Sequence, residues 1–333
     1  MLAVTAEYRV DPETGDWNVV APERAARPVD RTPGDAARCP FCPGHEDLTP
    51  PEVARFPADG PWQVRVVPNR YAIVTPAGPD GAASRWTDRG GDVRPATGRH
   101  EVVVESPQHD GDLRFATTAQ AAAVLRVLRD RCRALAADRP AAIVVFRNHG
   151  VAAGTSLRHP HSQIISLDQV PPGLQRRWDR TRVHFARTGR RLHDDLAAAE
   201  RADRVRVVSD AGGLLVYQPK ASAVGHQTVL LPDDDAAGLE AASDPALDAV
   251  AAMLPRVAGA LAKVRDDPAY NLVVHAGPVT DPAAHRWYRW YITLYPRVGR
   301  RAGLELATGL GVNPAVPEQT APALRAALGR VPA

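Results

Sequence analysis

Alternating apolar and polar residues in the first half of the chain predict several strands and one helix. A short strand is expected at 17–22, after a turn. Residues 118–138 have apolar positions at helical spacing, with Thr117 or Thr118 as N-cap. The remaining segments with a strand pattern are 62–74, 99–107, 141–150 and 156–167.

The second half repeats this order after a charged helical connector at 174–204. Strands are predicted at 204–210, 213–219, 226–232, 270–278 and 286–296, with a helix at 245–267 before the last two. Neither half alternates strand and helix strictly, as a doubly wound parallel sheet would. The pattern predicts an α+β protein with antiparallel sheets, packed helices and an internal duplication. We place the two domains at 1–175 and 176–333.

Composition and charge narrow the class of protein. The chain has 333 residues, 44% of them hydrophobic, and a formal net charge of +3. This charge is too small to indicate a nucleic-acid partner. There is neither a secretory leader nor an apolar run of the ~20 residues that a membrane helix needs. We therefore expect a cytoplasmic protein without a membrane partner.

Two of the three cysteines form Cys39-Pro-Phe-Cys42, in a stretch rich in Pro, Gly and Asp. In a reducing compartment this spacing indicates a metal site or a redox pair rather than a structural disulfide. There is no second Cys pair, so further metal ligands would have to be His or carboxylate. Cys132 lies in the predicted helix, and we assign it no role.

The sequence His159-Pro160-His161-Ser162-Gln163 is the main candidate for chemistry. In a strand, His159, His161 and Gln163 share one face, and Pro160 and Ser162 point to the other. Because proline lacks a backbone donor, this strand is expected at a sheet edge or at a bulge. Ordinary polar strand residues are the alternative interpretation.

The loop before this strand contains Gly150, Gly154, Thr155 and Ser156. Small residues let backbone N–H groups approach a phosphate, and hydroxyl groups add donors. A neutral histidine facing such a loop could attack phosphorus and form a reactive phosphoramidate.

Several motifs occur in the order known from one family. They are "YRVDPETGDWNVVAPERAARP", "CPFCPG", "VRVVPNRY", "HEVVVESPQH", "RNHGVAAGTS" followed by "HPHSQ", and "LELATGLGVNPAVPEQTA". The chain thereby resembles the galactose-1-phosphate uridylyltransferases, a branch of the histidine triad superfamily that is related to adenylyltransferases acting on nucleoside-diphosphate sugars. The resemblance covers nearly the whole chain and implies two tandem histidine-triad-like domains, the first catalytic and zinc-binding.

The resemblance implies that His161 is the nucleophile. It would attack the α-phosphorus of a nucleoside-diphosphate sugar, release sugar 1-phosphate and hold the nucleotide until a second sugar 1-phosphate takes it. Gln163 would steady the phosphoryl oxygens. Glutamine can donate a hydrogen bond but cannot protonate a leaving group, so Gln163 favours transfer over hydrolysis.

The resemblance also implies the remaining site residues and a homodimer. A structural, closed tetrahedral zinc site would tie the Pro-rich loop to the catalytic strand. Its ligands would be Cys39, Cys42, His109 and His159. The substrate-binding residues would be Arg24, Arg27, Asn69, Asn148, Thr155, Ser156, Asn313 and Gln319.

The chain departs from the family pattern in places that bear on substrate choice. Relatives have roughly His-Trp-His where this chain has Arg289, Trp290 and Tyr291, which argues against a second metal site. Ser162 replaces the usual glycine, as in the adenylyl-transferring branch. We expect a UDP-glucose–hexose-1-phosphate uridylyltransferase. An ADP-sugar phosphorylase with phosphate as acceptor and a non-catalytic nucleotide-binding protein are the alternatives.

Overall fold

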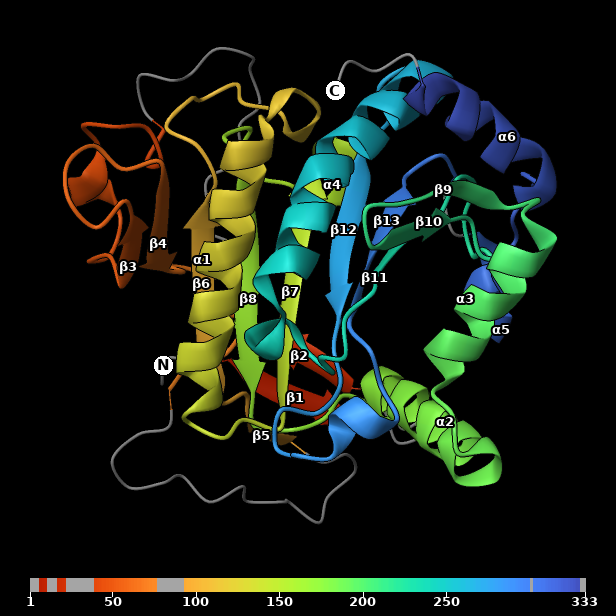
Figure 1. Ribbon diagram of the computed structural model, residues 1–333. Coiled ribbons are helices and arrows are strands. Elements are labelled where there is room, and N and C mark those ends of the chain that lie inside the picture. Colours follow the sequence, from red (N-terminus) through yellow and green to blue (C-terminus); the bar gives the residue numbers. More distant parts are fainter. Residues whose placement is uncertain (1–5, 11–16, 22–38, 77–92, 300–301, 330–333) are drawn as a thin grey trace.

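A ten-stranded sheet forms the centre of the protein (Figure 1). The computed structural model describes residues 6–10, 17–21, 39–76, 93–299 and 302–329. Every paired strand in the large sheet runs antiparallel to its neighbour, in the order β3-β4-β6-β8-β7-β12-β13-β11-β10-β9. A small sheet has the order β2-β1-β5. The α+β class predicted from the sequence is confirmed.

The strands of the large sheet are β3 (Ala54–Phe56), β4 (Val64–Pro68), β6 (Gly98–Val104), β7 (Ala142–His149), β8 (His161–Leu167), β9 (Val207–Ala211), β10 (Leu214–Tyr217), β11 (Thr228–Pro232), β12 (Tyr270–His275) and β13 (Tyr291–Pro296). Those of the small sheet are β1 (Glu7–Val10), β2 (Trp17–Val20) and β5 (Val93–Pro95). The α-helices are α1 (Thr118–Ala136), α2 (Pro172–Thr188), α3 (Leu192–Asp203), α4 (Asp244–Arg265), α5 (Gly303–Thr308) and α6 (Pro317–Leu328). Short 3-10 turns are η3 (Glu46–Leu48), η4 (Leu113–Phe115), η5 (Val151–Ala153), η6 (Leu239–Ala241) and η7 (Ala284–Arg286).

The large sheet contains the same arrangement twice. The order β3-β4-β6-β8-β7 in the first half matches β9-β10-β11-β13-β12 in the second, counted from the opposite edge. One long helix follows the third strand of each set, α1 after β6 and α4 after β11. The two sets meet where β7 pairs with β12, with Asn148 opposite Asn271. The topology is therefore that of a duplicated unit, as its sequence pattern indicates.

The two long helices lie side by side on one face of this sheet (Figure 1). The Thr117 hydroxyl caps α1 by accepting from the Gln120 N–H at 3.1 Å, and Ser243 caps α4 in the same way. Their apolar faces, which include the fully buried Leu247, form the main core with the strands beneath. This packing leaves the opposite face of β6, β8 and β7 for other uses.

The strand β8 is not at an edge, because it lies between β6 and β7; Pro160 comes just before its first residue, so the missing donor breaks no pair. The connector forms two helices, α2 and α3. The boundary proposed at 175/176 falls inside α2, and the two halves share one sheet; the division into two domains stays a prediction.

Within the described residues, no helix combines the length and the apolar character that crossing a membrane requires.

Candidate active site

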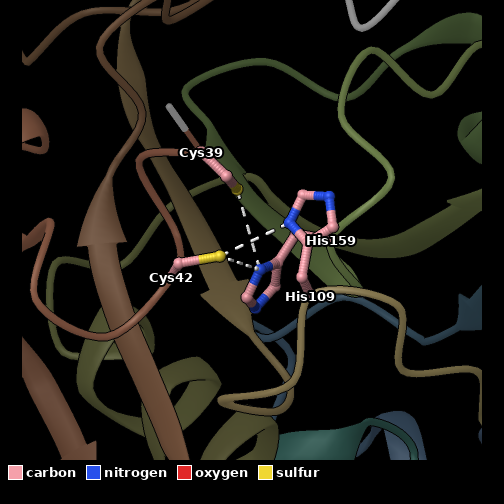
Figure 2. A group of neighbouring side chains, drawn as sticks. All are labelled: Cys39, Cys42, His109 and His159. Carbon is pink, nitrogen blue, oxygen red and sulfur yellow. Dashed lines mark hydrogen bonds between the residues drawn. The ribbon is translucent and has the colours of Figure 1, made fainter. Parts of the chain in front are cut away.

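Four side chains from three separate segments meet beside the start of β8. Cys39 and Cys42 come from one loop, His109 from the segment after β6, and His159 from the turn before β8 (Figure 2). The His159 Nδ1 lies 3.7 Å from Cys39 Sγ and 3.6 Å from Cys42 Sγ, and the His109 Nδ1 lies 3.4 Å from Cys42 Sγ. The structure thus brings together the predicted quartet.

The geometry of this cluster suits a tetrahedral metal ion. With Zn–S of ~2.3 Å and Zn–N of ~2.0–2.1 Å, tetrahedral angles put sulfur and nitrogen about 3.6 Å apart. The His159 Nε2 donates to the Ser106 carbonyl at 2.7 Å, so its Nδ1 keeps a lone pair directed at the cysteines. The cluster can therefore hold a metal, with both histidines coordinating through Nδ1.

Burial favours the neutral forms of Cys39, Cys42 and His159, whereas a bound cation would favour the thiolate form of the two cysteines. It raises the pKa of the Cys39 thiol to about 12, raises that of Cys42, and lowers the pKa of His159 to about 4. A neutral imidazole is the form that binds metal. A buried thiolate at Cys39 and a half-buried one at Cys42 need a positive charge nearby, and a divalent cation would supply it.

In a second group of possible ligands, Asp112, His149 and Asp267, the two carboxylates are already paired with an arginine. The Arg114 guanidinium lies 3.1 Å from an Asp112 oxygen and 2.8 Å from an Asp267 oxygen. This group is therefore an ion-pair cluster. The Cys39, Cys42, His109 and His159 quartet has the character of a metal site.

The cysteine loop also shapes the pocket above β8. The Phe41 ring, between the two cysteines, lies 5.5 Å from the His161 ring. His45 contacts the Cys39 carbonyl at 2.8 Å through Nδ1, which closes the loop on itself. A metal in the quartet would therefore hold Phe41 against the strand that carries His161.

His161 and Gln163 face a pocket of about 280 Å³ on the side of the sheet away from α1 and α4. The His161 Nδ1 donates to the His159 carbonyl at 2.8 Å, and because a carbonyl only accepts, the Nδ1 carries the proton. The Nε2 of the neutral ring then presents its lone pair. Such a nitrogen can attack phosphorus. Of the predicted substrate residues, Asn69 and Ser156 line this same pocket.

The other face of the strand forms a buried polar network. The Ser162 hydroxyl donates to Glu105 at 2.5 Å, and the second Glu105 oxygen lies 3.1 Å from the Arg147 Nε. Arg147 also donates to the Tyr270 hydroxyl at 2.8 Å. A larger cavity of about 400 Å³ adjoins this network under the helices, away from His161. The network fixes the strand from behind.

One residue that contacts the pocket glutamine was missed from the sequence. The His100 Nε2, on β6, lies 2.8 Å from the Gln163 Oε1, and the ring is buried. The available signal was alternation: in "HEVVVESP", His100 and Val102 share a face, and Val102 is opposite Gln163.

Other predicted substrate residues are used within the fold. The Thr155 hydroxyl donates to the Leu157 carbonyl at 3.0 Å, and the Asn148 amide oxygen accepts from Asn271 at 2.8 Å. Asn148 is on β7, and by alternation it faces the same side as His161. These two residues lie near the pocket, and their contact with a substrate stays a prediction.

The two C-terminal candidates lie away from this pocket, and the two N-terminal ones belong to a part of the chain that the structure does not describe. The Asn313 amide donates to the Ser222 carbonyl at 3.1 Å, and Gln319 is exposed on α6, which packs on β9 and α4 near the far edge of the sheet. Arg24 and Arg27 lie outside the described residues. All four assignments stay predictions.

Fold and site define an antiparallel α+β protein with a pocket histidine beside a Cys/His cluster. The chain belongs to the galactose-1-phosphate uridyl transferase family, a nucleotidyltransferase family, since the profile of its N-terminal domain matches residues 2–171. This confirms the resemblance seen in the motifs.

Three relatives show how far the similarity extends. An ADP-glucose phosphorylase from Arabidopsis thaliana is 29% identical over 96% of this chain and 92% of its own length. Its structure with bound ADP-glucose matches with a TM-score of 0.75 over 97% of this chain and 98% of that one. A galactose-1-phosphate uridylyltransferase from Thermotoga maritima is 24% identical over 96% of this chain and 98% of its own length. The solved structure of a uridylyltransferase is 29% identical, with a TM-score of 0.80 over 97% of this chain and 99% of that one.

Proposed function

We propose that this protein transfers a nucleoside monophosphate from a nucleoside-diphosphate sugar to a second phosphate-bearing acceptor, through a covalent bond to His161. The observation that carries the proposal is the His161 ring in its pocket: Nδ1 donates to the His159 carbonyl, so Nε2 is the nucleophile.

The two half-reactions balance without an added acid. The Nε2 bonds to the α-phosphorus as the bond from this phosphorus to the bridging oxygen breaks, and the electron pair leaves on the sugar 1-phosphate. The Nδ1 proton stays on the ring and faces the His159 carbonyl, which stabilises the positive charge of the phosphorylated imidazole. An acceptor phosphate oxygen then attacks the same phosphorus and returns the lone pair to Nε2.

Gln163 would donate its amide hydrogens to the phosphoryl oxygens during both steps. Asn69 and Ser156, which line the pocket, would contact the nucleotide. Asn148 and Thr155 would hold the phosphate end. We further propose that Arg24, Arg27, Asn313 and Gln319 contact substrate and that the protein is a homodimer.

A zinc ion in the Cys39, Cys42, His109 and His159 quartet is part of this proposal. Four protein ligands leave no open coordination position, so the ion would be structural. It would supply a rigid link between the cysteine loop and the turn that precedes β8.

UDP-glucose as donor with a hexose 1-phosphate as acceptor is the first candidate, supported by family membership. ADP-glucose with inorganic phosphate as acceptor is the second. Two observations favour it: Ser162 stands where the uridylyltransferase motif has glycine, and the Arabidopsis thaliana ADP-glucose phosphorylase matches nearly the whole chain.

Intact-protein mass spectrometry after mixing with UDP-glucose or ADP-glucose tests both candidates. The expected result is a mass gain of one UMP or one AMP in the wild type and none in His161→Ala. The matched control is His285→Ala, whose histidine is exposed and outside the pocket, and it should gain the same mass as the wild type. The adduct is then challenged with galactose 1-phosphate or inorganic phosphate, and the compound that removes it is the acceptor. A protein with full metal content and no adduct from either donor contradicts the proposal.

A further inference from the structure

We propose that His100 is a positioning residue that sets the orientation of the Gln163 amide, so that its NH2 group faces the phosphoryl group in transfer. The inference rests on the proposed function and extends it to a residue outside the recognised motif.

The strand register places the two side chains on one face. Gln163 on β8 is opposite Val102 on β6, and Ile165 is opposite His100. His100 is thus the diagonal neighbour of Gln163 on the face that carries His161. Both side chains are at least nine-tenths buried, with 5% of His100 and 9% of Gln163 exposed. A fixed contact between them is therefore shielded from water.

The backbone decides which ring nitrogen of His100 carries the proton. The Ile73 N–H donates to the His100 Nδ1 at 3.2 Å, and a backbone amide can only donate. The neutral ring therefore keeps its hydrogen on Nε2. That hydrogen points at the Gln163 Oε1, 2.8 Å away. The two atoms are donor and acceptor in that order.

This hydrogen bond distinguishes the two ends of the Gln163 amide. With the oxygen held by His100, the NH2 group is the end of the amide that is left to donate to the phosphoryl group. The reversed amide would place a carbonyl oxygen beside the anionic phosphoryl group and would repel it. Only the orientation imposed by His100 gives the transferring group a hydrogen-bond donor.

The same ring connects Gln163 to the turn that follows β4. The Asn69 Nδ2 lies 3.0 Å from the His100 Nε2, while the Asn69 Oδ1 accepts from the Tyr71 N–H at 2.8 Å. Because the Nε2 hydrogen points to Gln163, the contact with the Asn69 NH2 is not a hydrogen bond, and the turn holds the ring through the Ile73 N–H. The turn that would contact the nucleotide also holds the ring that orients Gln163.

A double-mutant cycle separates positioning from packing. The variants are His100→Phe, which keeps a ring but removes both nitrogens, Gln163→Ala, and the two combined. The measurement is the single-turnover rate of nucleotide attachment to His161, with the donor that labels the wild type. Metal content and the melting temperature of each variant are recorded as folding controls.

The expected pattern has three parts. Gln163→Ala slows attachment about 100-fold, because one fixed donor is lost. His100→Phe slows it about tenfold, because the Gln163 NH2 group is present but badly oriented. The affinity for the nucleotide-sugar substrate changes less than about threefold. Adding His100→Phe to Gln163→Ala causes no further loss, because His100 acts only through Gln163.

A second substitution keeps the test decisive if His100→Phe does not fold. His100→Asn has a shorter polar side chain that withdraws the donor from Gln163, and it enters the same cycle with the same expectation. His100→Gln can accept from Ile73 and donate to Gln163, so it should recover the wild-type rate within about threefold.

The inference is overturned if removing the His100 ring slows attachment equally with and without Gln163, or leaves the rate unchanged when Gln163 is present. If the wild type forms no adduct, the proposed function fails and this inference fails with it. If the wild type is labelled but His100→Phe has the wild-type rate, only the inference about His100 fails.

Discussion

The two halves of the sheet have the same strand order, but they differ on the face away from α1 and α4. The first half has a pocket there, and the second half has packed side chains. In the first half, His161 begins β8 and opens into a pocket. In the second half, Tyr291 begins the corresponding strand β13, and its ring stacks on His275 with centroids 4.5 Å apart. Arg177, from α2, donates to the Tyr291 hydroxyl at 2.6 Å. One half has room for a ligand, and the other is filled by its own side chains.

The difference lies in what the chain places above each strand. Above β8 lie the loop between β7 and β8, which contains Gly150 and Gly154, and the loop with the two cysteines. Small side chains in the first of these loops leave room for a ligand. The second half has side chains from two helices, including His193 of α3, whose ring centroid is 4.7 Å from that of Tyr288. A duplicated topology thus supplies two equivalent places, and local loop sequence determines which becomes a site.

The largest expected effect separates the halves directly. His161→Ala should lower the steady-state transfer rate by at least about 10⁴-fold, because the covalent route is lost. Tyr291→Phe, at the corresponding position of β13, should stay within about threefold of wild type. Comparable losses in both variants would show that the second half takes part in the chemistry.

Loss of the proposed metal site should also act on the first half alone. Exchanging Cys39 and Cys42 for serine should abolish metal binding and destabilise the protein by several kcal/mol, because binding free energy contributes to folding. Hydrogen exchange should increase at the cysteine loop and β8 and stay unchanged at β13. Exchange that rises equally in both strands would refute a local role for the metal.

The network behind β8 offers a third comparison. Glu105 and Arg147 are 8% and 3% exposed, so Glu105→Gln leaves a buried guanidinium without its charge partner and should cost about 3 kcal/mol of unfolding free energy. The control is Asp138→Asn, in an exposed pair with Arg99, which should cost less than about 1 kcal/mol. Urea unfolding measures both, and equal costs would contradict a buried network.

The filled half should make stability depend on pH. Burial, followed by the charge of Arg289, lowers the pKa of His193 to about 3 from 6.5, so the unfolded chain binds the proton more readily. Stability is complete above the unfolded pKa and is lost as pH falls from 6.5 towards 3. At pH 5 the loss from this one group is about 2 kcal/mol.

The matched variant for this effect is His193→Phe, which cannot take up a proton. Its unfolding free energy should fall less between pH 8 and pH 5 than that of the wild type. His275, whose pKa burial also lowers well below 6.5, should account for part of the remaining slope. A variant with the wild-type slope would show that His193 is not the titrating group.

Tyr291→Phe should have a smaller effect on stability than Glu105→Gln. It removes the hydroxyl that accepts from Arg177, and a typical net hydrogen bond contributes about 1 kcal/mol. Thermal unfolding measures the loss. A cost several times larger would mean that Arg177 depends on this hydroxyl for its burial.

The sequence predicted most of what local chemistry controls. Periodicity located most strands and both long helices, although it did not predict β1, β3 and β5. The face shared by His161 and Gln163 follows from strand alternation. The metal quartet followed from the family resemblance, and the structure brings its four members together. These features depend on spacing within short segments or on motifs that can be compared with relatives.

What was missed depends on contacts across strands. The edge position or bulge expected for β8 was wrong: the strand lies between β6 and β7 with an unbroken register, and the sequence around Pro160 does not show which strands flank it. The role we propose for His100 needs the register of β6 on β8 and the position of the Ile73 N–H. The network joins Glu105, just after β6, to Arg147 on β7, and single-segment patterns do not contain that pairing.

The most direct test is to digest the protein after labelling with its nucleotide-sugar donor and to map the modified residue by mass spectrometry. We predict the nucleotide on His161 alone, with no label on the peptides that carry His193 or His275. A label in the second half, or an unlabelled His161 in a protein that still turns over, would contradict the account.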